Sequence, residues 1–148
     1  MKILAFTFAL LAATSAQAEP DRISLLIGSH HIGAIQQFQE SNPGIFLTWE
    51  DRSGFDLSFG AYQNSYGKSS VAATAALPIL RGDNADLSVF AGVALYPGDG
   101  HNFAIHAGDL VPVGGLQLRV GNVFVQAMPG DGKAVDGIVS FGLTWALK

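Results

Sequence analysis

Hydrophobic and polar residues alternate along most of this chain, over positions 22–147. Alternation with a period of two is typical of β-strands, because successive side chains of a strand point to opposite faces. The pattern is clearest in 86–96, where large residues such as Leu87 and Val89 alternate with smaller ones such as Ser88. The predicted strands are 22–31, 44–50, 55–63, 70–79, 86–96, 103–111, 116–128 and 137–147.

The two faces of these predicted strands differ in size as well as in polarity. One face carries large aliphatic and aromatic side chains, and the other carries small residues such as Gly60, Ala72 and Gly92. An even number of strands, most of them about 9–11 residues long, suits a barrel that crosses a bilayer at a tilt. We therefore predict an all-β fold, an eight-stranded antiparallel transmembrane β-barrel, in preference to a soluble sandwich or a lipocalin-like barrel.

The connections between the predicted strands fall into two groups. If the N-terminus is periplasmic, the longer connections lie outside and the shorter turns inside, which is the asymmetry of outer-membrane barrels. Tyr62, Tyr66 and Tyr96 are then expected in an aromatic girdle. The external connections are 32–43, 64–69, 97–102 and 129–136, and the turns are 51–54, 80–85 and 114–115.

The first residues have the features of a secretory signal peptide. Lys2 precedes an apolar core at 3–13, and 16–18 (AQA) is an A-x-A cleavage site. The apolar core is too short to span a bilayer, which needs about 20 residues. We expect a signal peptide at 1–18 and a single β-barrel domain at 19–148, located in the bacterial outer membrane.

Composition narrows the functional classes further. The 12 Asp and Glu residues outnumber the 8 Lys and Arg residues, which argues against a nucleic-acid partner. Because the chain contains no Cys, disulfides and thiol chemistry are excluded. His101 and His106, with Asp99 and Asp109, match no strong metal-ligand spacing, so neither a metal nor a cofactor is expected.

The topology brings together polar residues that lie far apart in the sequence. The first predicted strand ends at His30-His31 and the third ends beside Asn64-Ser65, on the same rim. A histidine next to a serine is the minimum for a general base that activates a hydroxyl, and an amide could orient either group or stabilise an oxyanion. Strict alternation would direct His30 into the lumen, whereas His31 lies nearer the loop. An Asn-Ser pair in a turn can also simply cap backbone groups.

Five short motifs occur in a characteristic order along the chain: 42–51 (NPGIFLTWED), 60–68 (GAYQNSYGK), 86–93 (DLSVFAGV), 110–113 (LVPV) and 126–130 (QAMPG). In this order the chain resembles the PagP family of outer-membrane lipid A palmitoyltransferases and its divergent relatives. The resemblance covers most of the chain after residue 18.

The resemblance implies a catalytic histidine on the first strand and a catalytic Asp-Ser pair after the third. The histidine corresponds to His31, or to His30 as the alternative, and the serine corresponds to Ser65. Asn64 stands where the family has an aspartate. Because asparagine neither takes up a proton nor carries charge, its role would be orientation or hydrogen-bond donation.

The resemblance also implies how a lipid would enter the barrel. Pro112 and Pro129 resemble prolines that flank gaps in the barrel wall, where a residue without an N–H leaves the ladder open, although ordinary strand-end prolines would look the same. Ala76 resembles the small residue at the floor of the acyl pocket. Its methyl group predicts a preference for a somewhat shorter acyl chain than glycine would give.

The sequence therefore predicts a monomeric acyltransferase whose partners are phospholipid and lipid A in the outer membrane. Ser65 would be the nucleophile or a positioned hydroxyl, and His31 the base. The alternative is a non-catalytic barrel of the same fold that binds lipid or interacts at the surface, which the asparagine at position 64 favours. A lipid A deacylase is less consistent with the sequence, because no late strand carries a His-x-Ser pair.

Overall fold

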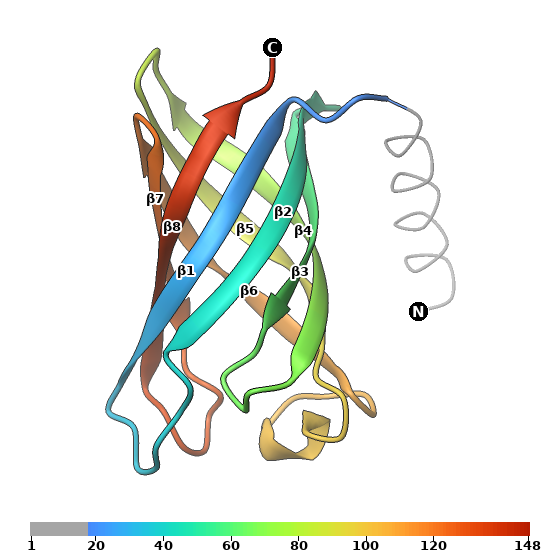
Figure 1. The fold of residues 1–148 in the computed structure, drawn as a ribbon, viewed down its shortest axis with the longest axis vertical. Helices are drawn as coiled ribbons and strands as arrows, with labels where there is room; N and C mark the ends of the chain where they lie inside the picture. The colour runs from blue at the N-terminus through green and yellow to red at the C-terminus, as the bar shows by residue number, and fades with distance from the viewer. Residues whose placement is uncertain (1–17) are drawn as a thin grey trace.

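The computed structural model describes residues 18–148, so the predicted signal peptide at 1–18 lies outside the described residues except for Ala18. This part of the chain forms a closed antiparallel barrel of eight strands, in which each strand pairs with the next and the last pairs with the first (Figure 1). The predicted all-β, eight-stranded antiparallel barrel is confirmed. No helix within residues 18–148 is long and apolar enough to cross a membrane. The elements are β1 (Arg22–Ile32), β2 (Ser41–Arg52), β3 (Phe55–Gln63), β4 (Ser69–Arg81), β5 (Ala85–Leu95), the 3-10 helix η1 (Gly100–Asn102), β6 (Leu110–Val120), β7 (Val123–Pro129) and β8 (Gly137–Ala146).

The sixth and seventh strands differ from the prediction. The expected turn at 114–115 lies inside β6, and most of the expected strand 103–111 belongs to the β5–β6 connection. The chain reverses instead after Gly121, whose φ of +55° lies in the left-handed region that glycine adopts most easily. Gly115 is small for another reason, because a side chain there would collide with the backbone of Ala127. The strand count is unaffected, since one turn replaces the other.

The two ends of the barrel carry different connections (Figure 1). The loop end carries 33–40, 64–68, 96–109 and 130–136, whereas the turn end carries 53–54, 82–84 and 121–122. The chain enters β1 and leaves β8 at the turn end. The predicted asymmetry between long and short connections is therefore present in the fold.

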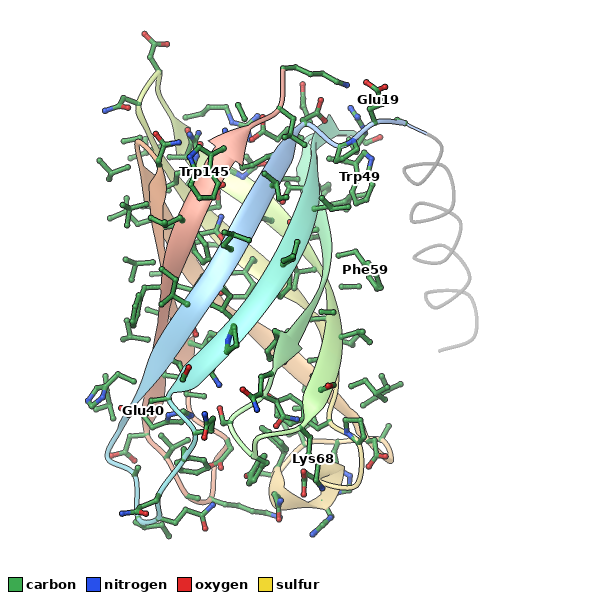
Figure 2. All side chains as sticks on the ribbon, viewed as in Figure 1. Glu19, Glu40, Trp49, Phe59, Lys68 and Trp145 are labelled. Carbon is green, nitrogen blue, oxygen red and sulfur yellow. The ribbon has the colours of Figure 1, made fainter. Side chains whose placement is uncertain are left out.

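The outer wall of the barrel is apolar on all eight strands. Figure 2 shows Phe59 projecting from the wall, with Trp49 and Trp145 nearer the turn end. This is the opposite of a water-soluble barrel, in which the large apolar side chains point inward. The exposed, outward-facing residues include Leu25, Ile45, Phe59, Leu77, Val93, Leu118, Val125 and Phe141, one from each strand.

The interior contains aromatic residues that were expected on the outside. Tyr96 is only 8 % exposed and packs with Ala72 and Ala94, and Tyr62 and Tyr66 pack against the same cluster. The expectation of an aromatic girdle formed by these tyrosines is therefore wrong. Small residues on the inward face leave room for the rings, so the large aromatic side chains fill the loop-end half of the lumen.

Candidate active site at the loop end

His31 and Ser65 meet inside the loop end of the barrel. Nε2 of His31 lies 2.9 Å from Oγ of Ser65, although 34 positions separate the two residues. The side chain of His31 is 2 % exposed, whereas that of His30 is 69 % exposed. Of the two candidate histidines, the structure therefore brings His31 to the serine and leaves His30 outside.

A β-bulge in β1 explains why His31 faces inward. The register of β1 against β8 shifts between Leu26 and Gly28, which leaves Ile27 as an extra residue. One extra residue exchanges the inward and outward faces for the rest of the strand. Odd-numbered residues such as Leu25 consequently face outward before the bulge, and His31 faces inward after it.

Asn64 builds the turn that presents the serine. Its side chain is fully buried, and its Oδ1 accepts hydrogen bonds from the backbone N–H of Tyr66 (2.9 Å) and Lys68 (3.1 Å). Its Nδ2 donates to Oγ of Ser70 at 2.8 Å. All of these hydrogen bonds stay within the loop and the start of β4. Asn64 therefore positions Ser65 through the backbone, and the structure gives no support to a direct contact of the amide with the histidine.

The β1–β2 connection completes the surroundings of the pair. The ring of Phe38 stacks on the imidazole of His31, with centroids 4.4 Å apart and planes inclined by 13°. The same ring contacts Tyr66 edge to face, at 5.8 Å. The N–H of Gln39 donates to the carbonyl oxygen of Ser65 at 2.8 Å. The two loops are therefore tied together beside the reactive atoms.

Asn42 is a second buried amide that the sequence reasoning placed in a loop and assigned no role. Its side chain is almost fully buried, and its Oδ1 accepts a 2.6 Å hydrogen bond from Oγ of Ser29. Its Nδ2 donates to the carbonyl oxygens of Gln39 and Gln63, both at 3.1 Å. It thereby joins β1, β2, β3 and the first loop. The available signal was the Asn-Pro pair at the start of the motif 42–51.

Glu40 is the acidic residue that the sequence analysis missed. Its Oε1 lies 3.0 Å from Nδ1 of His30 and accepts a 3.3 Å hydrogen bond from the backbone N–H of His31. The same oxygen is 4.0 Å from Nδ1 of His31, which is buried and has no hydrogen-bond partner. Figure 2 labels Glu40 at the loop end, on the first connection.

Burial also affects the ionisation of the neighbouring phenol. Desolvation raises the pKa of Tyr66 to about 12, and the carboxylate of Asp131 acts in the same direction. The Tyr66 hydroxyl therefore stays neutral at physiological pH. The ring of Phe38 on His31, backed by the ring of Tyr66, therefore forms an uncharged aromatic contact on one side of the imidazole.

The two prolines flank a stretch where the barrel wall is incompletely paired. The ladder between β6 and β7 runs from Val120 only as far as the pair Leu116–Ala127, although β6 continues to Leu110. Pro112 and Pro129 lie on the two strands beyond the last pair. Both prolines therefore lie beyond the paired part of the β6–β7 ladder.

A central cavity connects the serine with the position predicted to be the acyl-pocket floor. Ser65 and Ala76 both line it, and it continues to Asp86 and Arg119 near the turn end. Ala76 is 8 % exposed and stands opposite Asp56 on β3. The residue therefore lies where the apolar half of the lumen meets the charged half.

No cluster of three or more His, Cys, Asp or Glu side chains suited to a metal ion occurs in residues 18–148. In sequence comparisons, no model of a known protein family matches the chain, and no curated protein is significantly similar to it. The chemistry of this site therefore has to be inferred from its geometry and from its motifs.

Proposed function

We propose that this protein is a PagP-like acyltransferase of the bacterial outer membrane, which moves a fatty acyl chain from a phospholipid to lipid A. The observation that carries the proposal is the 2.9 Å contact between Nε2 of His31 and Oγ of Ser65 at a cavity inside the barrel. A histidine within hydrogen-bond distance of a serine hydroxyl is the arrangement that activates a nucleophile. The stacked ring of Phe38 fixes the imidazole in this orientation.

The proposed reaction has two half-steps that use the same pair. In the first, Oγ of Ser65 attacks the ester carbonyl carbon of the phospholipid while Nε2 of His31 takes the hydroxyl proton. The lysophospholipid leaves with that proton, and the acyl group stays on Ser65 as an ester. In the second, a lipid A hydroxyl gives its proton to His31 and attacks the acyl-enzyme, and Ser65 leaves as the alcohol.

The rest of the barrel supports a lipid substrate. The apolar outer wall suits a bilayer, and the interrupted ladder beside Pro112 and Pro129 offers a lateral path for a lipid. The cavity beneath Ser65 would take up the acyl chain, with Ala76 near its end. Phospholipid and lipid A are therefore the proposed partners of a monomeric barrel.

Mass spectrometry of lipid A tests the proposal in cells with and without the gene. We expect one additional acyl chain when the gene is present, and its loss with Ser65→Ala or His31→Asn. With detergent-solubilised protein and phospholipid donor, each variant should transfer at least about 10³-fold more slowly, as expected when a nucleophile or its base is removed. Ser69→Ala, an exposed serine four positions away, is the matched control and should transfer normally.

Two results would separate the remaining alternatives. An acyl group found on Ser65 by intact-protein mass spectrometry, with donor but no acceptor, supports the nucleophile over a merely positioned hydroxyl. Identical lipid A in the presence and absence of the gene, with no effect of Ser65→Ala on transfer in vitro, would rule out the acyltransferase. The non-catalytic lipid-binding or surface-interaction barrel would then remain.

A further inference from the structure

The imidazole of His31 lacks a partner on one side. Its Nε2 faces Ser65, but its Nδ1 is buried and has no hydrogen-bond partner. A buried N–H without an acceptor costs about 1–3 kcal/mol. Asn64 does not fill this position, because its amide hydrogen bonds are made within its own loop.

The unpaired nitrogen matters because it determines which tautomer the ring adopts. Nε2 can take a proton from Ser65 only if the proton of the neutral ring sits on Nδ1. In the opposite tautomer, Nε2–H would donate to the serine and no base would be available. A carboxylate near Nδ1 favours the productive tautomer and stabilises the imidazolium that forms.

Glu40 is held in position to provide that carboxylate. The backbone N–H of His31 and the ring of His30 both bind its Oε1, at 3.3 and 3.0 Å. The neighbouring Gln39 is tied to the backbone of Ser65. The separation of 4.0 Å from Nδ1 of His31 shortens to a hydrogen bond with a movement of about 1 Å.

We propose that Glu40 is a positioning residue that accepts a hydrogen bond from Nδ1–H of His31 and so directs the Nε2 lone pair at Ser65. The catalytic consequence of this role rests on the proposed acyl transfer. Its effect on the tautomer of His31 does not. Asn64 does not compete for this role, because its hydrogen bonds stay within its own loop and the start of β4. His30 anchors the carboxylate from the exposed side, and Asp131 is the other acidic group whose charge acts on His31.

Nitrogen NMR of the imidazoles in the detergent-solubilised, ¹⁵N-histidine-labelled protein tests the proposal directly. His31→Asn, compared with wild type, assigns the His31 signals. We expect the Nδ1–H tautomer for His31 in the wild-type protein at neutral pH. In Glu40→Gln, whose amide can donate to Nδ1, we expect a shift to the Nε2–H tautomer. Asp109→Asn makes the same carboxyl-to-amide change elsewhere at the loop end and should leave the signals of His31 in place.

Kinetics provides the second readout. Glu40→Gln should lower kcat for acyl transfer by about 100-fold with KM within about 2-fold, because the carboxylate acts on the base rather than on the lipid. A wild-type Nε2–H tautomer would overturn the proposal, as would an Nδ1–H tautomer that persists in Glu40→Gln. A kcat for Glu40→Gln within about 3-fold of wild type would do so as well. If the wild-type protein transfers no acyl chain, the proposed function fails, whereas the tautomer measurement still decides the role of Glu40.

Discussion

The loop end and the turn end of the barrel are held together by different interactions. At the loop end, the fully buried polar contacts are hydrogen bonds between uncharged side chains, such as Ser29 with Asn42 and Asn64 with Ser70, and the ion pair Lys68–Asp99 lies nearer the surface. At the turn end, they are ion pairs inside or beside the lumen. These pairs are Arg22–Glu50, Arg52–Asp21, Arg81–Asp56 and Arg119–Asp86.

The two ends of the lumen therefore use different kinds of polar contact, ion pairs at the turn end and mainly neutral hydrogen bonds at the loop end. Oppositely charged side chains can fill the lumen at the turn end, but removing one member of a pair leaves the other charge buried without a partner, which lowers stability. At the loop end, a network of amides and hydroxyls fixes the turn that carries Ser65, and the carboxylate of Glu40 lies 4.0 Å from Nδ1 of His31. The loop end is therefore suited to hold His31 and Ser65 in a fixed geometry, whereas ion pairs fill the lumen at the turn end.

The largest effect is expected from breaking an ion pair at the turn end. The side chains of Arg119 and Asp86 are 16 % and 12 % exposed. Arg119→Met leaves the carboxylate unpaired and should lower the free energy of unfolding by about 2–3 kcal/mol, somewhat less than for a fully buried pair. Chemical denaturation in detergent micelles, followed by tryptophan fluorescence, measures the change.

The double variant Arg119→Met with Asp86→Leu sharpens this test. Because it removes both charges, it should recover most of the lost stability. His31→Asn at the loop end should destabilise the barrel less than Arg119→Met does, because it shortens a buried side chain but leaves no buried charge unpaired. If the single and double variants at the turn end were equally unstable, pairing would not be what stabilises this end.

The barrel could be predicted from the sequence because its signals are local. Period-two alternation and the contrast between a large and a small face determined the number of strands and their antiparallel order. The turn after β6 was misplaced because the pair Gly114-Gly115 looks like a turn signal. Those glycines are required by the close approach of neighbouring backbone, which the sequence does not reveal.

The pairing of a histidine with Ser65 could also be anticipated, because strand count and direction put both on one rim. The choice of His31 over His30 depends on a bulge at Ile27, which is marked only by the apolar run 25–27 that interrupts the alternation. Glu40 was missed because it lies in a loop, whose path across the barrel mouth is not encoded by periodicity. The tyrosines were misassigned because their size suggested a girdle, whereas the small residues around them make room inside.

A smaller effect is expected from a substitution at Ala76, which lies at the boundary between the two ends. Ala76 faces the cavity opposite Asp56, where an acyl chain would first meet charge. Ala76→Gly should deepen the apolar part by about one methylene and change the ratio of rates for two chain lengths by about 10-fold. Acyl-donor profiling measures this ratio. Ala75→Gly on the outer face is the matched control, and equal preferred lengths in wild type and Ala76→Gly would contradict the predicted floor.

The smallest effect is expected from placing a charge at the buried amide of Asn64 in the loop end. In Asn64→Asp, the carboxylate can accept the same N–H bonds from Tyr66 and Lys68 and an O–H bond from Ser70. Because these bonds offset most of the desolvation cost, stability should change by less than about 1 kcal/mol. Acyl transfer should stay within about 3-fold, since the side chain supports the turn rather than His31.

The same variant distinguishes a structural from a catalytic position 64. If the rate of Asn64→Asp rose by more than about 10-fold, the acid at this position would act on the histidine and replace Glu40 in that role. Combining it with Glu40→Gln makes the comparison sharper. If the residue at position 64 acts only by holding the turn, the double variant should transfer acyl chains as slowly as Glu40→Gln alone. Recovery of the rate in the double variant would show that an acid can reach His31 from either loop.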